Sequence, residues 1–178
     1  MSVKYHNFGG VIGWNLQKYF PNLSSDSYLK LQRSTRNKLQ QEYIDYFLST
    51  DEPPMPLVVN LETINRCNST CSFCTANKNA EKRPYKRMED SLFYSIIDQL
   101  ADWGYTGHLT LYGNNEPFLD TRIVDFHKYC REKLPHSFIF LSSNGLLLTV
   151  DKVKEIIPYV NQLIINNYCR DMKLHDNV

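Results

Sequence analysis

The stretch LVVNLETINRCNSTCSFC, residues 57–74, joins an apolar run to three closely spaced cysteines. Residues 57–61 are rich in leucine and valine, which favours a buried β-strand. The chain then reaches Cys67, Cys71 and Cys74, whose spacing is C-x3-C-x2-C. Four clustered cysteines would close a tetrahedral zinc site or ligate every iron of a four-iron cluster, whereas three leave one metal position without a protein thiolate. The stretch therefore indicates a strand that leads into an open metal site.

Beyond this strand, short apolar runs alternate with segments of helical periodicity. The runs predict strands and the periodic segments predict helices. The expected strands are residues 57–61, 108–112, 138–142 and 162–166, and the expected helices are residues 89–103, 120–134 and 150–157. A βαβαβαβ order predicts a parallel sheet with right-handed crossovers, in which sites form at the carboxyl ends of the strands. The predicted fold class is α/β.

The segment before the first strand has a different character. Residues 26–49 place apolar side chains at approximately helical spacing, at Leu31, Leu39, Tyr43, Phe47 and Leu48. This pattern predicts one long helix. The helix is expected to end before Pro53, Pro54 and Pro56, because proline cannot continue a helix. We therefore expect a helical N-terminal extension over residues 1–55 and a core over residues 56–178.

Composition limits the classes of partner. The chain has 178 residues, with 20 Lys and Arg against 19 Asp and Glu, so no overall field indicates binding to nucleic acid or to an anionic membrane. Its apolar runs are shorter than the roughly 18 residues of a membrane helix, and its N-terminus lacks the apolar core of a secretion signal. These features predict a cytoplasmic protein. An odd cysteine count of five argues against a disulfide framework there, because that compartment keeps thiols reduced.

Polar motifs follow the other expected strands. Gly113-Asn114-Asn115-Glu116-Pro117 follows the second strand, Ser142-Ser143-Asn144-Gly145 follows the third, and Asn166-Asn167 follows the fourth. The carboxyl ends of parallel strands are where sites form in such sheets. Each motif therefore follows its strand as the cysteines follow the first strand, and all of them are expected at the same edge of the sheet.

The cysteine spacing, with an aromatic residue just before the third cysteine, resembles the radical S-adenosylmethionine (SAM) superfamily. The segment after the second strand is similar to the Gly-Gly-Glu-Pro segment of that family, although asparagine replaces its second glycine and one extra residue precedes the glutamate. The turn after the third strand is similar to the family's Thr-Asn-Gly turn. The resemblance spans roughly residues 56–168. It implies a partial parallel (β/α) barrel of the radical SAM type, with about four of its six βα units present.

The resemblance also implies cofactors and roles. Cys67, Cys71 and Cys74 would ligate a [4Fe-4S] cluster, and SAM would chelate the fourth iron. The implied SAM contacts are Phe73, Gly113, Asn114, Asn115, Glu116, Asn144 and Asn166. The implied reaction is reductive cleavage of SAM to a 5′-deoxyadenosyl radical, which abstracts hydrogen from a peptide or small-metabolite substrate. An electron donor of the flavodoxin or ferredoxin type would be a partner.

One alternative stays open at this point. With only four expected strands, either the chain is a fragment of a longer enzyme, or a partner or the N-terminal helix covers the edge of the fourth strand, or the chain is a truncated relative with reduced function. A degenerate relative would be a noncatalytic metal-binding module, holding zinc or an iron–sulfur cluster, or an interaction module. His108 is a candidate fourth zinc ligand in that case, although a histidine at a strand end is ordinarily a packing or solvated residue.

Several other residues have side chains or a spacing that could also indicate a site. The basic run at Lys78, Lys82, Arg83, Lys86 and Arg87 is interpreted as a solvated loop rather than an anion contact. Cys130 is expected to be a buried, inert thiol. Cys169 is a candidate relay that could face the site, with a structural role favoured. Gly9, Gly10 and Gly13 lack a preceding strand, so they make no dinucleotide-binding loop.

Overall fold

The computed structural model describes residues 25–50, 55–71, 73–74 and 83–166. Its elements follow the predicted alternation of strands and helices. In chain order they are α2 (Ser25–Ser49), β1 (Val58–Asn60), α4 (Asp90–Asp102), β2 (His108–Thr110), η1 (Pro117–Leu119), α5 (Ile123–Lys133), β3 (Phe138–Ser143), α6 (Val150–Ile156), η2 (Ile157–Tyr159) and β4 (Gln162–Ile165). Each of the helices and strands expected from the sequence is present within a few residues of its expected bounds.

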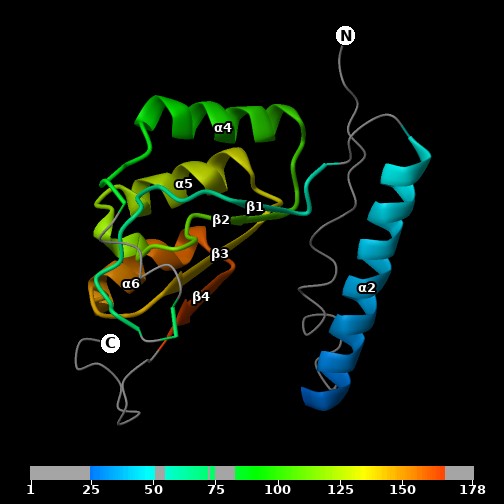
Figure 1. Ribbon diagram of the computed structural model, residues 1–178, viewed down its shortest axis with the longest axis horizontal. Coiled ribbons are helices and arrows are strands. Elements are labelled where there is room, and N and C mark those ends of the chain that lie inside the picture. Colours follow the sequence, from blue (N-terminus) through cyan, green and yellow to red (C-terminus); the bar gives the residue numbers. More distant parts are fainter. Residues whose placement is uncertain (1–24, 51–54, 72, 75–82, 167–178) are drawn as a thin grey trace.

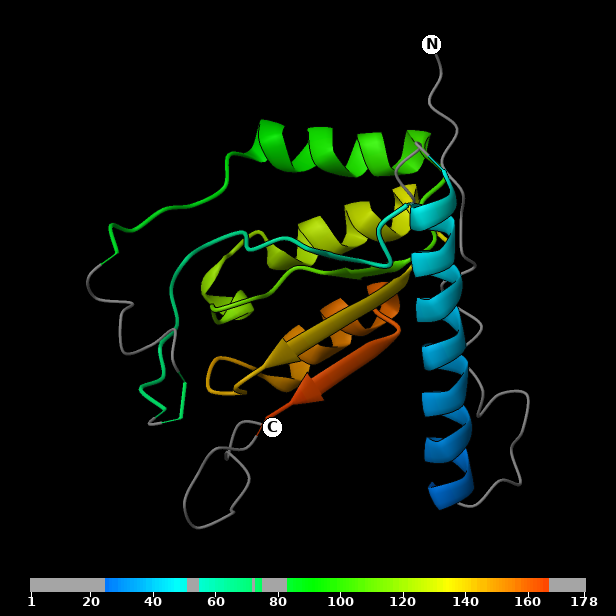
Figure 2. The same ribbon diagram turned by 45° about the vertical axis from the view of Figure 1, so that its right-hand side comes forward.

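The four strands form one parallel sheet in the order β1-β2-β3-β4. Strands that pair in chain order through right-handed crossovers place their connecting helices on one face of the sheet. Accordingly, α5 packs against both α4 and α6, and Figures 1 and 2 show these helices stacked along the sheet. The predicted α/β class with a parallel sheet is confirmed.

The core lies between this sheet and the helices. The rings of Phe93 on α4 and Phe126 on α5 stack with centroids 3.8 Å apart. Ile139 and Leu141 on β3 are fully buried beneath the helices. Met55, just before β1, is 2% exposed and belongs to the same apolar cluster, so the core includes the last residue of the expected extension. The division of the chain at this point otherwise stays a prediction.

Helix α5 begins later than expected, at Ile123, because the residues before it make a different structure. The Asp120 carboxylate accepts hydrogen bonds from the backbone N–H of Arg122 at 3.1 Å and from its guanidinium at 2.8 and 2.7 Å. Burial alone would raise the pKa of Asp120, but the bonds from Arg122 outweigh it and lower that pKa. The same guanidinium donates to the carbonyl of Met88 at 2.9 Å. This turn therefore fastens the segment after β2 to the start of α4.

Cys130 fulfils the expectation of an inert thiol. Its side chain is fully buried on α5, and burial raises the pKa of the thiol. A protonated, inaccessible sulfur neither binds metal nor reacts readily. Cys130 is therefore a core residue.

Among the described residues, no helix combines the length and apolar character needed to span a bilayer. The described side chains of α2 are mostly exposed, including Ile44, Phe47 and Leu48. On the helix surface, Gln41 donates to Asp45 at 2.8 Å and Lys38 lies 3.9 Å from Glu42. Such pairs, four residues apart, stabilise an exposed helix modestly.

Two histidines are buried in the core. His127 on α5 is fully buried, and its Nδ1 lies 2.7 Å from the carbonyl oxygen of Ile123. His108 at the start of β2 stacks on Phe138 with ring centroids 4.7 Å apart. Burial lowers the pKa of each histidine from the ordinary 6.5 to about 4. Both side chains are therefore neutral in the folded protein at pH 7.

We expect the free energy of unfolding to decrease as the pH falls from 6.5 to about 4. In this window the unfolded chain binds protons at both histidines and the folded chain does not, so protonation favours unfolding. The expected loss at pH 5 is on the order of 2 kcal/mol for each histidine. Urea unfolding at pH 8 and pH 5 measures it, and His127→Gln should reduce the difference. Equal free energies at the two pH values would contradict this expectation.

Candidate functional site

Residues 64–65, directly after β1, are joined to residues 84–87, and the described residues 66–71 and 73–74 between them are called the cysteine loop. Ile64 forms an antiparallel bridge with Arg87. The side chain of Asn65 donates to the carbonyl of Pro84 at 2.9 Å and accepts from the backbone N–H of Lys86 at 2.8 Å. These bonds fix the chain just before Cys67, so the cysteine loop starts from a defined position at the carboxyl end of β1.

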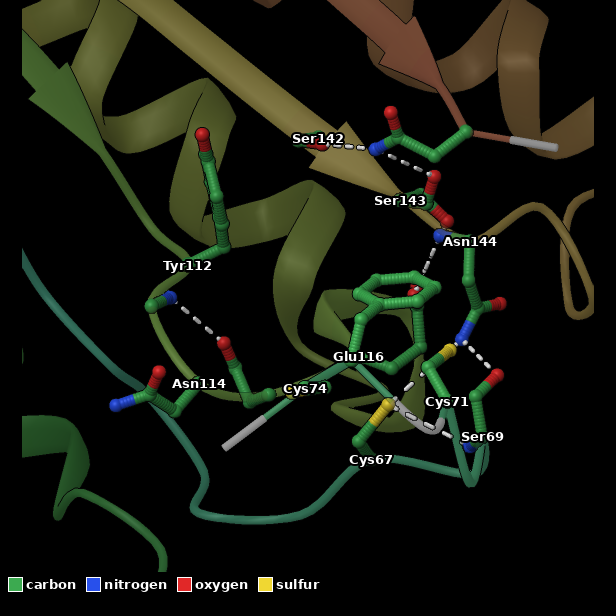
Figure 3. Close-up of a pocket in the computed structure, with 14 residues that line it drawn as sticks. Cys67, Ser69, Cys71, Cys74, Tyr112, Asn114, Glu116, Ser142, Ser143 and Asn144 are labelled. Carbon is green, nitrogen blue, oxygen red and sulfur yellow. Dashed lines mark hydrogen bonds between the residues drawn. The ribbon is translucent and has the colours of Figure 1, made fainter. Parts of the chain in front are cut away.

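Glu116 joins the ends of two neighbouring strands, and its side chain is only 1% exposed. Its Oε1 accepts hydrogen bonds from Ser143 Oγ at 2.8 Å and from the backbone N–H of Phe118 at 3.2 Å. Its Oε2 accepts from the backbone N–H of Asn144 at 2.8 Å, as Figure 3 shows. A carboxylate offers roughly four acceptor positions. Three of these positions are used within the protein, and the bonds from Ser143 and Asn144 hold the end of β3 against the segment after β2.

Asn144 connects the end of β3 to the cysteine loop. Its Nδ2 lies 2.8 Å from Asn68 Oδ1, 3.0 Å from Ser69 Oγ and 3.8 Å from Cys67 Sγ. Its Oδ1 accepts from the backbone N–H of Leu146 at 3.0 Å. The amide thus bridges from the turn after β3 to three consecutive residues of the loop.

The turn after β2 is held by a residue that follows β1. Glu62 Oε1 accepts from the backbone N–H of Asn114 at 2.8 Å, and a Cβ on Gly113 would lie 3.7 Å from the same oxygen. The backbone N–H of Gly113 donates to Asn115 Oδ1 at 2.9 Å. This bond fixes the orientation of the Asn115 amide, because only the oxygen can accept from an N–H. The Asn115 Nδ2 is buried and has no hydrogen-bond partner among the described residues.

Asn166, directly after β4, bonds to the end of the neighbouring strand β3. Its Nδ2 donates to Ser142 Oγ at 2.6 Å, and its backbone N–H donates to the carbonyl of Ser143 at 2.8 Å. The backbone and the side chain of Asn166 therefore continue the pairing of β3 with β4 beyond Ile165, the last residue of β4.

These segments surround one pocket of about 160 Å³ at the carboxyl end of the sheet (Figure 3). Every residue that the sequence analysis assigned to the site lines it, and the roles of these residues stay predictions. They are Cys67, Cys71, Phe73, Cys74, Gly113, Asn114, Asn115, Glu116, Asn144 and Asn166. Phe73 is 66% exposed, so its ring borders the opening.

The cysteine sulfurs share this pocket without forming a finished metal site. Within the described part of the chain, no three cysteine, histidine, aspartate or glutamate side chains converge closely enough to hold a metal ion. Burial of the Cys71 thiol raises its pKa, and the negative charges of neighbouring Cys67 and Cys74 raise it further. Thiolates at these positions repel one another, and a bound cation or cluster would relieve that repulsion. The donor set therefore fits a thiolate-ligated metal group.

The structure separates His108 from the cysteines. His108 is the first residue of β2, whereas the cysteine loop follows the carboxyl end of β1, which runs parallel to β2. The two lie at opposite ends of the sheet. His108 is thus no ligand beside Cys67, Cys71 and Cys74 in this fold.

The described residues of the basic run differ in exposure. Lys86 and Arg87 are exposed, and Arg87 lies 3.5 Å from Asp90 in an ion pair. Arg83 is half-buried, and its carbonyl accepts from the Arg66 guanidinium at 2.6 Å. The other residues weighed from the sequence lie outside the described residues: Lys78, Lys82, Cys169, Gly9, Gly10 and Gly13.

Sequence reasoning missed several residues that shape the site. Ser69, Tyr112, Ser142 and Ser143 line the pocket, and Glu62 holds the turn after β2. Glu62 directly follows the first expected strand, so its position at a strand end was an available signal. Ser142 and Ser143 belonged to the motif after the third strand, but no pattern assigned a role to their hydroxyl groups.

Comparison with known proteins identifies the family of this chain. A family model described as the radical SAM superfamily matches residues 61–166, which is more than half of the chain. This chain belongs to the radical SAM superfamily. The match begins beside Glu62 and ends at Asn166, so it contains all the strand ends that form the pocket. The predicted family is confirmed.

The chain is also similar to known proteins over part of their length. The S-adenosyl-L-methionine-dependent 2-deoxy-scyllo-inosamine dehydrogenase of Niallia circulans is 22% identical over 99 residues, covering 56% of this chain and 39% of that protein. The crystal structure of BtrN in an open conformation matches with a TM-score of 0.57 and 20% identity, covering 65% of this chain and 51% of BtrN. BtrN in complex with AdoMet and 2-DOIA matches with a TM-score of 0.56 and 19% identity, covering 62% and 45%.

These likenesses show that the chain has the radical SAM fold over its parallel sheet. The chain spans about half or less of the length of each of these relatives. As a radical SAM protein, it supplies part of a (β/α) barrel, with the pocket at the carboxyl ends of its strands.

Proposed function

We propose that this radical SAM protein holds a [4Fe-4S] cluster on Cys67, Cys71 and Cys74 and binds SAM in the adjoining pocket. The observation that carries the proposal is the convergence of the three cysteines with polar groups from the ends of β2, β3 and β4 around one cavity. Three thiolates leave one iron of a cubane cluster open to a further ligand. The cavity beside them has room for part of such a ligand.

Asn115 supports the fit of a polar ligand. Its buried Nδ2 has no partner among the described residues, and an unpaired buried donor costs about 1–3 kcal/mol. A bound carboxylate would satisfy it. We assign the backbone of Gly113 and Asn114, which Glu62 holds in place, and the Asn115 amide to the methionine part of SAM.

The other pocket residues are assigned by their exposure and bonding. Phe73 borders the opening and is proposed to pack against the adenine. Glu116 has about one acceptor position left after its protein bonds, and we propose that it accepts from the amino group of SAM while keeping the strand ends together. Asn144 and Asn166 are proposed to contact the ribose or the carboxylate from the ends of β3 and β4.

The cluster and SAM, when bound, supply a reductive cleavage that yields a 5′-deoxyadenosyl radical able to take hydrogen from a substrate. The residues of the chain hold the thiolates, orient the nucleotide and shield it from water. An electron donor of the flavodoxin or ferredoxin type is the proposed reductant. A peptide or small metabolite is the proposed substrate class. One similar enzyme is named a 2-deoxy-scyllo-inosamine dehydrogenase, and for that reason we propose to include amino-polyols among the small metabolites tested.

Anaerobic reconstitution with iron and sulfide tests the proposal. We expect about four irons and four sulfides per chain, a spectrum that changes on addition of SAM, and release of 5′-deoxyadenosine on reduction. Stoichiometric zinc in place of iron would favour a noncatalytic metal-binding module. A cluster whose spectrum is indifferent to SAM would overturn the assignment of the pocket.

A further inference from the structure

We infer that Asn144 is a positioning residue, which docks the cysteine loop on the end of β3 and donates a hydrogen bond to the sulfur of Cys67. The inference rests on the proposed function where it concerns the cluster. It goes beyond that function, because it assigns the Asn144 side chain to the protein's own loop and makes the three cysteines unequal.

The orientation of the Asn144 amide is determined by its surroundings. The side chain is 7% exposed, and its oxygen accepts from the backbone N–H of Leu146 at 3.0 Å. The NH2 group must then face the cysteine loop. It reaches Asn68 Oδ1 at 2.8 Å, Ser69 Oγ at 3.0 Å and Cys67 Sγ at 3.8 Å. Figure 3 shows the amide directed at Ser69 and Cys67.

Cys67 is attached to the fold on both sides. On its N-terminal side, the carbonyl of Arg66 accepts from the backbone N–H of Glu116 at 2.8 Å. On its C-terminal side, Asn144 holds the next two residues of the loop. Asn144 is itself fastened by its backbone N–H to Glu116 Oε2 at 2.8 Å. One buried carboxylic residue therefore anchors both supports of Cys67.

The other two cysteines lack such supports. Cys67 Sγ also accepts from the backbone N–H of Ser69 at 3.5 Å. Within the described part of the chain, no hydrogen-bond donor is found at the sulfur of Cys71 or Cys74; a local bond joins their backbones, from the N–H of Cys74 to the carbonyl of Cys71 at 3.1 Å. Cys67 is thus the positioned cysteine.

This asymmetry has an electrochemical consequence. Hydrogen bonds to the cysteine sulfurs of an iron–sulfur cluster are among the determinants of its reduction potential. A donor stabilises the more negative, reduced state. Removal of one hydrogen bond of about 1.4 kcal/mol would make one-electron reduction about tenfold less favourable, a decrease of about 59 mV.

The first test uses the reconstituted chain and compares Asn144→Ala with Asn166→Ala. Both changes remove an asparagine amide from the pocket wall, but the amide of Asn166 bonds to the end of β3 instead of to a sulfur. Redox titration followed by electron paramagnetic resonance should show that reduction of the cluster is about tenfold less favourable in Asn144→Ala. The reduction potential should be unchanged in Asn166→Ala. Asn144→Leu, which nearly preserves the side-chain volume, should behave like Asn144→Ala. Unchanged potentials in both Asn144 variants, or an equal shift in Asn166→Ala, would overturn the inference.

The second test uses the chain without metal, so its outcome is independent of the proposed function. Iodoacetamide alkylation, followed by peptide mass spectrometry, should be several-fold faster at Cys67 in Asn144→Ala than in the wild type, while the rate at Cys74 changes less. An unchanged Cys67 rate would overturn the docking role. The wild type could take up no cluster while Cys67 is still alkylated several-fold faster in Asn144→Ala than in the wild type. In that case the proposed function fails and the docking role stands.

Discussion

Replacing Cys67, Cys71 or Cys74 with alanine is expected to abolish retention of a [4Fe-4S] cluster. Each change leaves only two cysteine thiolates to hold the cluster. A second iron then lacks its strong anionic ligand, and water does not replace a thiolate. Iron and sulfide analysis after anaerobic reconstitution, with the absorption spectrum of the cluster, measures the loss. We expect iron to fall from about four per chain to near background.

Cys130→Ala is the matched control for these variants. Cys130 is fully buried on α5 and lies outside the set of residues that line the pocket, so its loss should cost stability but no iron. A small cavity in the core is the expected defect, of about 1–2 kcal/mol. Equal loss of iron in all four variants would contradict the ligand assignment, and so would full retention in any of the other three.

Replacing Glu116 with alanine is expected to destabilise the fold by about 3–5 kcal/mol. The change strands the backbone N–H groups of Phe118 and Asn144 and the hydroxyl of Ser143, which all donate to this carboxylate. It also leaves a cavity, because the Glu116 side chain that is removed is buried, with 1% of its surface exposed. Urea unfolding of the metal-free chain measures the effect without any contribution from cofactors.

Glu62→Ala provides the comparison for Glu116. Glu62 is half-buried and accepts one backbone bond, from Asn114, so its removal should cost only about 1 kcal/mol. Glu116→Gln should lose less than Glu116→Ala, because the amide oxygen can still accept from Ser143. That variant is therefore the better one for SAM titration, where weakened binding with retained iron is expected. A Glu116→Ala chain as stable as the wild type would refute the clamping role.

Much of the fold could be predicted because its signals are local. The apolar runs and helical periodicities define β1, α4, β2, α5, β3, α6 and β4 within a few residues. The spacing of Cys67, Cys71 and Cys74 indicated three metal ligands with one position open. Since the ends of parallel strands share one edge of a sheet, the order of motifs along the chain was enough to expect that they meet.

The partners of the individual polar groups were decided by the tertiary structure. Glu116 was expected to face SAM, and it accepts three hydrogen bonds within the protein, one of them from Asn144, 28 positions away. Glu62 meets Asn114 across 52 positions, and Asn144 meets Cys67 across 77. A periodic pattern states which face of an element is buried, but hydrogen bonds require ångström-level placement that depends on how strands and loops pack. The sequence by itself therefore determined the order of elements, the family and the strand ends at which the pocket forms. Packing alone decided which residues at those strand ends hold the others in place, because buried donors and acceptors must pair with whatever the fold brings within reach.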